Sequence, residues 1–413
     1  MLETLVKAWQ LPDLRKKITF TAWMFVIFRL GAHIPVPGIN PEGVAALLRE
    51  GTLFGFFDII SGGAFKNLSV FAMGIVPYIN SSIIMQLLTV VIPYLERLAK
   101  EGEEGRKKIV AYTRYGTVLL GAIQATGMAI FLGRSTTAGV PALAHPSFWN
   151  YAVIVISLTA GTIFLMWMGE MITERGIGNG ISLLIFAGIV SRFPSMGYQV
   201  VQYVRTGEAS VVALIFFLVM AVVVIGGIVA MNEGQRRIPV QYAKKVVGRR
   251  VYGGQSTHIP MRVNQAGVIP VIFAISILLF PSTISTWFPN NAFMAAVTRI
   301  FRPGTAFYLS LYALLIIFFT YFYTAVTFNP RDVADNIKKY GGFIPGLRPG
   351  RPTAEYIERV LSRITLAGAI FLAIIALLPN FVEATTGMNI AFGGTSLLIV
   401  VGVALETMKQ LEA

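Results

Sequence analysis

The residues that commonly carry catalysis are few and scattered in this chain. There is no cysteine, which excludes disulfides, thiol catalysis and cysteine-bound metals. The three histidines, His33, His145 and His258, form no ligand cluster. We find no phosphate-binding loop and no nucleophile paired with a base, and the GIGNG stretch at 176–180 is predicted to begin a helix, not to bind a dinucleotide. The sequence therefore predicts a protein that is not an enzyme and that uses no metal or cofactor.

Polar side chains are found instead inside an apolar run. The segment GIVPYINSSIIMQLL at 74–88 contains Pro77 and, in a row, Asn80, Ser81 and Ser82. Amides and hydroxyls gain nothing from lipid tails, which cannot hydrogen-bond them. We therefore expect these side chains to face an aqueous path or the polar groups of another helix. Pro77 removes one backbone hydrogen bond and favours a kink.

The composition places this run in a protein with many membrane spans. Of the 413 residues, 55% are hydrophobic and only 13% charged, whereas soluble domains carry about 25% charged residues. Residues 1–17 are polar and amphipathic, and no small-residue cleavage site follows the first apolar run, so no cleavable signal is expected. Ten apolar runs have about the length of a spanning helix: 18–33, 69–93, 112–133, 149–170, 178–193, 210–231, 264–287, 305–328, 362–380 and 391–408.

An eleventh apolar piece, LFGFFDIISGGAF at 53–65, is too short to span and contains Asp58. Pieces of this length are typical of re-entrant or interfacial segments. Arg29 lies near the outer end of the first span, where a long side chain can reach the interface.

The net charge of +14 is explained mainly by membrane topology. One set of alternate loops, with both termini, holds 26 of the 34 Lys and Arg residues, and the other set holds 7. The positive-inside rule places both termini in the cytoplasm. We expect no specific DNA binding from this charge.

Two short motifs recur along the chain. GIVP at 74–77 returns as GVIP at 267–270, and GISLLI at 180–185 returns as GTSLLI at 394–399. Both repeats follow the order of the spans, so each half has five spans, and the odd number inverts the second half. The predicted fold is an all-α membrane protein with halves at 18–193 and 210–408. Inverted repeats place the working site between the halves, near the midplane.

Isoleucines recur on the repeated helices, some of them four residues apart and so on one helix face. Ordinary core packing explains this pattern, and so does an aliphatic ring that closes a pore by excluding water. Mid-span acids are essentially absent, which disfavours a proton- or sodium-coupled transporter. The six positions are Ile75, Ile79, Ile181, Ile185, Ile272 and Ile399.

Long motifs resemble one known family. They include FRLGAHIPVPGIN (28–40), FGFFDIISGGAF (54–65), GIVPYINSSIIMQLLTVV (74–91), FLMWMGEMITERGIGNGISLLIFAGIV (164–190), YGGQSTHIPMRVNQAGVIPVIFA (252–274) and FNPRDVADNIKKYGGFIPGLRPG (328–350). With them the chain resembles the SecY family, the large subunits of bacterial protein-conducting channels, nearly end to end. The resemblance implies a clamshell of two five-helix halves around a central pore, in the bacterial cytoplasmic membrane.

The resemblance also implies roles for residues. The six isoleucines match the pore ring. Spans 2 and 7, with 3 and 8, match a lateral gate toward lipid, and Gln86 and Asn264 are expected to join its polar residues as a latch. Residues 55–65 match the plug, with candidates Phe56, Phe57, Asp58, Ile59, Ile60, Ser61, Gly62 and Gly63. The gate candidates are Asn80, Ser81, Ser82, Gln86, Asn264, Ile277 and Phe280.

The basic loops 232–263 and 329–361 are longer than connectors need to be. Membrane topology alone is enough to explain their positive charge. The resemblance implies docking sites for the SecA ATPase and the ribosome, with candidates Arg249, Arg250, Arg331, Arg348 and Arg351. It also implies SecE and SecG as small partner subunits, secretory precursors with their signal peptides as substrates, and contact with membrane lipids.

The implied function is a channel that passes unfolded secretory polypeptides across the membrane and releases apolar segments sideways into lipid. An inverted-repeat secondary transporter of a small solute is the alternative, and a membrane scaffold is a third class.

Overall fold

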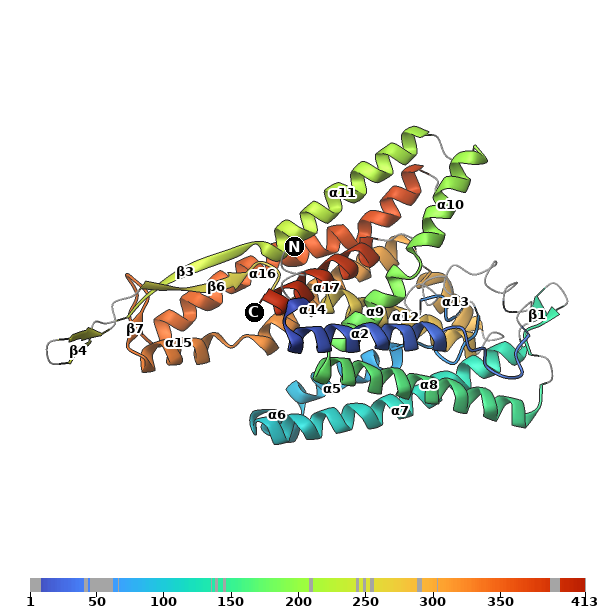
Figure 1. Cartoon of the computed structure of the whole chain (residues 1–413), viewed down its shortest axis with the longest axis horizontal. Helices are drawn as coiled ribbons and strands as arrows, with labels where there is room; N and C mark the ends of the chain where they lie inside the picture. The colour runs from blue at the N-terminus through green and yellow to red at the C-terminus, as the bar shows by residue number, and fades with distance from the viewer. Residues whose placement is uncertain are drawn as a thin grey trace.

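The computed structural model describes residues 9–40, 44, 62–65, 67–134, 136–137, 140–143, 146–207, 211–242, 245–247, 250–252, 256–287, 292–302, 304–386 and 394–412. These residues are mostly helical (Figure 1). The first half contains α2 (Pro12–Gly31), α5 (Val76–Val91), α6 (Pro93–Lys100), α7 (Glu103–Arg134), α8 (Phe148–Arg175), α9 (Gly180–Val190) and α10 (Phe193–Arg205). The second half contains α11 (Val211–Glu233), α12 (Ile269–Trp287), α13 (Ala292–Ile300), α14 (Ala306–Thr327), α15 (Pro330–Lys339), α16 (Arg351–Thr386) and α17 (Gly394–Glu412).

Each of the ten predicted spans contains one of these helices. Six described helical stretches are long and apolar enough to cross a membrane, and α5 with α6, bent by 100° at their junction, is a seventh candidate. The described apolar part of α12 is shorter, Ile269–Pro281. The chain is therefore a multi-pass membrane protein, while length and composition of the described helices do not by themselves give the predicted count of ten.

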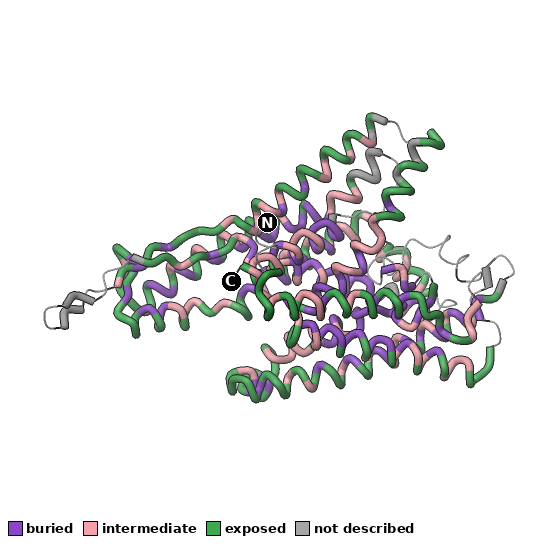
Figure 2. The backbone as a smooth tube through the Cα atoms, viewed as in Figure 1, coloured by how far each residue is buried: buried purple, intermediate pink, exposed green. Residues whose placement is uncertain are grey.

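Helices from the two halves meet in the middle of the molecule. Within the first half α7 packs between α5 and α8, and within the second half α14 packs between α12 and α16. Across the halves α9 contacts α17, and both α5 and α7 contact α12. Buried residues gather along these contacts (Figure 2), and the largest buried apolar cluster draws on both halves.

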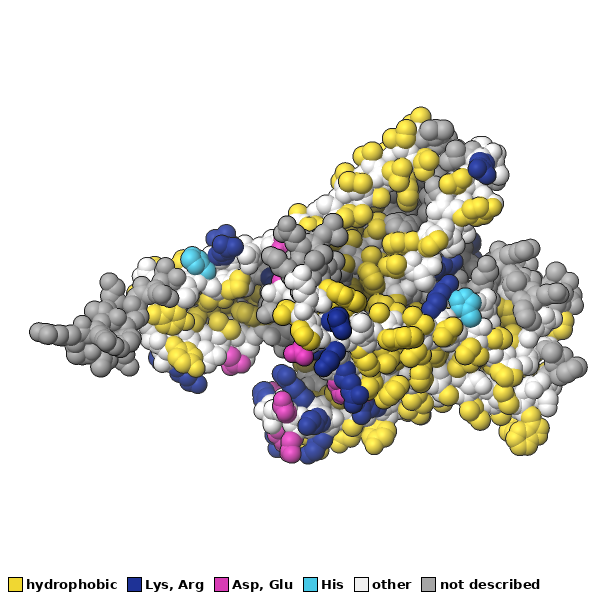
Figure 3. Space-filling view, viewed as in Figure 1, with side chains coloured by type: hydrophobic (Ala, Val, Ile, Leu, Met, Phe, Trp, Pro, Cys, Tyr) yellow, Lys and Arg dark blue, Asp and Glu magenta, His cyan; other side chains and the backbone are white. Residues whose placement is uncertain are grey.

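The outer surfaces of the helices are apolar. Helix α11 is the clearest case, because only 11% of the residues in its most apolar stretch are buried within the chain. Hydrophobic side chains cover the visible face of α11 and α2 in Figure 3, while Lys and Arg gather around α6 and toward the protruding end. Apolar surface of this extent is expected where lipid is the solvent.

The two basic loops are not irregular connectors. Strand β3 (Gln235–Tyr242) pairs antiparallel with β6 (Ser256–Arg262), and β7 (Gly342–Phe343) pairs with β3 on its other side. A short hairpin of β4 (Lys245–Val247) and β5 (Arg250–Tyr252) lies between β3 and β6 in the chain. This sheet, α15 and the first turns of α16 form one protrusion, visible at the left of Figure 1. It has its own core: Ile238, Val240, Met261, Ile337, Ile344, Ile357 and Leu361.

Helix α16 joins this protrusion to the rest of the molecule without a break. It begins at Arg351, well before the predicted span 362–380, and runs for 36 residues to Thr386. On the opposite end of the molecule, β1 (Thr136–Thr137) and β2 (Val140–Pro141) form a small hairpin.

Candidate functional site

The six isoleucines lie in the first turns of four helices, or directly before them. Ile75 precedes α5, and the others follow the starts of α5, α9, α12 and α17 within two turns. All six belong to one apolar cluster, with Ile181 and Ile272 partly buried at its edge. The buried members are Ile75, Ile79, Ile185 and Ile399. The structure therefore places all six in the apolar core between the halves, while their arrangement as a ring stays a prediction.

Local features fix where α9 begins. Asn179 caps the helix, its Oδ1 accepting a hydrogen bond from the Ser182 backbone N–H at 3.2 Å. The Gly180 N–H donates to Thr173 Oγ1 at 2.9 Å. A Cβ on Gly180 would lie 1.9 Å from the Gly169 carbonyl oxygen, so only glycine allows α9 to approach α8 this closely. This approach sets the position of Ile181 one residue later.

The predicted plug is described only at its end. Phe56, Phe57, Asp58, Ile59, Ile60 and Ser61 lie outside the described residues. Gly62 and Gly63 have φ angles of 67° and 85°, which residues other than glycine rarely adopt. A Cβ on Gly62 would lie 2.9 Å from the Gly188 Cα of α9.

Arg29 has a role that sequence reasoning missed. Its Nη1 donates to the Gly62 carbonyl at 2.8 Å and lies 3.4 Å from Ser191 Oγ, at the end of α9. The Ser191 hydroxyl also donates to the Gly62 carbonyl, at 3.4 Å. The guanidinium therefore binds the end of the predicted plug segment. No sequence signal joins the two residues, which are 33 positions apart.

The gate candidates lie on α5 and α12, which touch, except for Asn264, which precedes α12. The hydrogen bonds of Gln86 and Asn264 do not join the two helices. Gln86 Nε2 donates to Ser82 Oγ at 3.3 Å, and Asn264 Nδ2 donates to Asn232 Oδ1 at 3.0 Å on α11. In this structure the partner of Gln86 lies one turn back on its own helix, and the partner of Asn264 lies on α11. Their part in a polar latch stays a prediction. Ile277 packs against the central cluster, and Phe280 is exposed.

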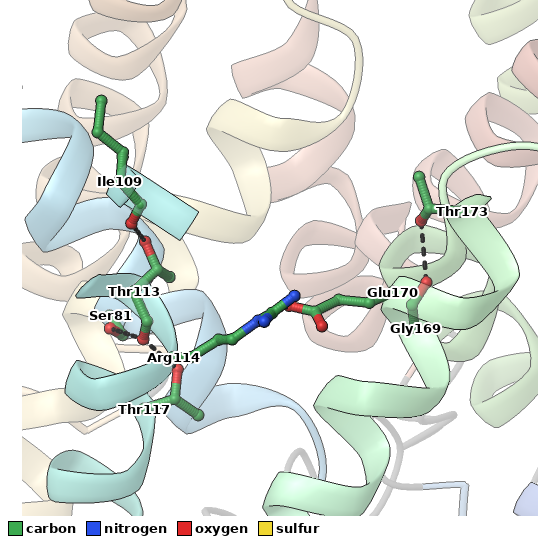
Figure 4. A network of polar contacts seen from close by, with 8 residues as sticks. All are labelled: Ser81, Ile109, Thr113, Arg114, Thr117, Gly169, Glu170 and Thr173. Carbon is green, nitrogen blue, oxygen red and sulfur yellow. Dashed lines mark hydrogen bonds and ion pairs between the residues drawn. The ribbon is translucent and has the colours of Figure 1, made fainter. Parts of the chain in front are cut away.

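Ser81 bonds to the neighbouring helix. Its side chain is buried, and its Oγ donates to the Thr113 carbonyl of α7 at 2.8 Å (Figure 4). A Cβ on Gly116 would lie 2.4 Å from Ser81 Oγ, so this glycine makes room for the hydroxyl. The polar run in span 2 is explained in part by this contact with another helix.

An ion pair joins α7 to α8 beside that contact. Arg114 Nε lies 2.8 Å from Glu170 Oε1 (Figure 4). The Arg114 side chain is 47% exposed and that of Glu170 17%, so the carboxylate is the more enclosed partner. Nothing in the sequence pairs these two residues, which are 56 positions apart.

Three of the docking candidates lie on the protrusion. Arg331, Arg348 and Arg351 are exposed there, and Arg351 Nε is 2.9 Å from Glu355 Oε1 one turn along α16. Arg250 lies in β5, and Arg249 lies outside the described residues. No group of three or more His, Cys, Asp or Glu in the described part of the chain is placed to hold a metal ion.

Comparison with known proteins decides the family. The SecY family profile matches residues 69–408. The protein translocase subunit SecY of Aquifex aeolicus is 48% identical over 416 residues, covering 100% of this chain and 97% of the relative. The chain belongs to the SecY family. The SecY subunit of Escherichia coli K12 is also 48% identical, over 97% of this chain and 92% of its own length.

Solved SecY and Sec61 structures share the fold. A protein-conducting channel structure matches with a TM-score of 0.67 at 18% identity, over 96% of this chain and 92% of that one. Sec61 in a canine ribosome–channel complex matches with a TM-score of 0.64, at the same identity and coverage. The resemblance to the SecY family noted from the motifs is confirmed, and so is a helical membrane fold of the channel type. Family identity also makes the chain a channel subunit and not an enzyme.

Proposed function

We propose that this chain, a protein translocase subunit of the SecY family, passes unfolded secretory polypeptides across the membrane and releases apolar segments sideways into lipid. The observation that carries the proposal is the single apolar cluster that holds all six isoleucines from four helices of both halves. An enclosed set of equivalent aliphatic side chains at the junction of two repeated halves suits a constriction that opens and closes.

The isoleucines suit a substrate without a fixed sequence. A site that recognised one side-chain pattern would hold some segments and reject others. Branched aliphatic side chains form weak, non-directional contacts and can spread around a passing chain. When no chain is present, they exclude water and so oppose ion flow.

Apolar segments leave between α5 and α12. On insertion a Leu or Ile contributes about −0.3 to −0.6 kcal/mol, while a central Asp, Lys or Arg costs about 2.5 to 3.5 kcal/mol. A segment of about 20 apolar residues is therefore drawn into lipid, and a polar chain continues through the pore. Contact of α5 and α7 with α12 supports this route.

The overall arrangement is a clamshell of ten spans, five in each half. The helices found in all ten predicted spans and the contacts of α9 with α17 and of α5 with α12, the repeated pairs, support it. Both termini face the cytoplasm of a bacterium, on the side that holds most Lys and Arg. Residues 55–65 form the plug of the outer funnel, and Arg29 holds its end at Gly62.

The protrusion is the docking surface for cytoplasmic partners. Arg331, Arg348 and Arg351 are exposed on it, and arginine binds carboxylate and phosphate through paired hydrogen bonds. The family suggests the SecA ATPase and the ribosome as these partners, with SecE and SecG as membrane subunits. A related channel, Sec61, has been solved in a ribosome complex.

Reconstitution of the purified chain with its small partner subunits tests the function. Vesicles are given a secretory precursor with or without SecA and ATP, and protected precursor is measured. We expect protection only with SecA and ATP. Saturable small-solute uptake without the ATPase would favour the secondary transporter instead, and a lack of both activities would favour a scaffold.

A further inference from the structure

We propose that α5, α7 and α8 form one mechanical unit that moves as a whole when the lateral gate opens, and that Ser81, Arg114 and Glu170 are the positioning residues that hold it together. This inference rests on the proposed gate between α5 and α12. It adds which helix contacts separate and which persist.

The first tie joins α5 to α7. Ser81 is 2% exposed, and its Oγ donates to the Thr113 carbonyl across the helix contact at 2.8 Å. Thr117 Oγ1 donates to the same carbonyl at 2.7 Å (Figure 4). Separation of α5 from α7 would take this partner away from the buried Ser81 hydroxyl, which is unfavourable.

The second tie joins α7 to α8. Arg114 and Glu170 are held at 2.8 Å, with the carboxylate largely enclosed. Because Arg114 is about half exposed, water screens part of this attraction, and loss of the Glu170 charge is expected to cost about 1 kcal/mol or less. Close packing supports the same contact, since a Cβ on Gly121 of α7 would lie 3.9 Å from Thr159 Cγ2 of α8 and 4.0 Å from Pro77 Cβ of α5. The three helices therefore converge at Gly121.

The contact between α5 and α12 is made by apolar side chains. Ile79 and Ile83 of α5 and Ile275 and Leu278 of α12 belong to the same apolar cluster. Lipid tails are as apolar as these side chains, so exchanging such contacts for lipid costs little. Gln86 bonds to Ser82 on its own helix, and Asn264 bonds to Asn232 within its own half. The seam against α12 is thus the contact that parts most readily.

Ser81, Arg114 and Glu170 therefore hold one side of the gate together. When α5 leaves α12, the hydrogen bond carries α7 with it, and the ion pair carries α8. A departing apolar segment then meets one rigid wall of three helices, not a single helix that bends away.

Two engineered disulfide tethers test this inference. The chain has no native cysteine, so each introduced pair supplies its only thiols. Gly121→Cys with Thr159→Cys joins α7 to α8 inside the unit. Asn80→Cys with Phe280→Cys joins α5 to α12 across the seam. Each is oxidised in the reconstituted translocase, and precursor transport is compared with that of the same sample after reduction.

We expect the tether inside the unit to leave transport unchanged and the seam tether to stop it. If the tether inside the unit also stops transport, the three helices do not move together and the inference is overturned, while the gate stands. If the seam tether has no effect, the gate assignment itself fails, and the inference fails with it.

A second measurement assigns the role to the ion pair. Glu170→Gln is expected to lower transport about fivefold, as loss of about 1 kcal/mol would. Oxidising the Gly121→Cys and Thr159→Cys tether in the inserted Glu170→Gln variant should restore the rate, because a covalent link replaces the lost tie after folding is complete. Failure of the tether to restore transport would remove the positioning role from Arg114 and Glu170.

Discussion

Replacing Ile79, Ile185 and Ile272 together by Asn is expected to make the resting channel leak ions. Ile79 and Ile185 are buried at 6% and 3% exposure, and Ile272 packs against the same cluster. Each fully buried isoleucine contributes about 1.5–3 kcal/mol of apolar burial, so the loss of Ile79 and Ile185 alone removes roughly 3–6 kcal/mol of the free energy that keeps water out. A shift of about 1.4 kcal/mol toward the hydrated state already multiplies its population tenfold.

Planar-bilayer conductance per inserted channel measures this effect, and we expect a rise of at least about tenfold. The matched control changes the same three residues to Val, which trims the side chains but keeps them apolar, and should leak far less than the Asn variant. Conductance of the Asn variant equal to that of the parent, at equal insertion, would refute the pore-ring assignment.

Three further outcomes are expected. Arg348→Glu with Arg351→Glu should lower SecA-driven precursor transport per inserted channel by about tenfold, as expected for lost charge-assisted hydrogen bonds. Arg299→Glu, on exposed α13, is the control. Equal transport rates in both variants would mean that the charges of the protrusion serve membrane topology alone. The Asn80→Cys and Phe280→Cys pair, or a pair within one turn, should form a disulfide on oxidation. Such a link requires the two Cα atoms to come within about 7 Å. Mass spectrometry detects the link, and its absence for every pair tested between α5 and α12 would mean that the two helices are not neighbours. Arg29→Ala should raise resting conductance by freeing the Gly62 carbonyl, with Arg29→Lys intermediate, and an unchanged conductance in Arg29→Ala would mean that this hydrogen bond has no part in the seal.

Apolar runs and repeated motifs were enough to place the helices. All ten predicted spans contain a helix, because the length of an apolar run and the period of its side chains are local properties of the chain. Two of the isoleucines could be grouped for a related reason, since the repeat aligns Ile185 with Ile399 without knowledge of any contact.

Pairings between distant residues could not be predicted in this way. The loops 232–263 and 329–361 were predicted to dock partners but not to pair with each other, yet Gln241 of β3 pairs with Phe343 of β7, and the two segments share a core. Arg29 with Gly62, and Arg114 with Glu170, are likewise contacts that depend on how helices cross. The hydrogen bonds of Gln86 to Ser82 and of Asn264 to Asn232 were likewise not predicted from the sequence.

The uninterrupted course of α16 has a mechanical consequence. Its early turns place Ile357 and Leu361 in the core of the protrusion, and its later turns place Leu372 and Ile375 in the central cluster. Its one internal proline, Pro379, comes after these residues, so the turns from Arg351 to Ile375, about 36 Å, contain no helix-breaking residue. This part of α16 therefore acts as a lever: a tilt of about 5° imposed by a partner on the protrusion would displace Ile375 by about 3 Å. Torque applied in the cytoplasm can thus reach the constriction through the backbone of one helix, without any rearrangement between the two points.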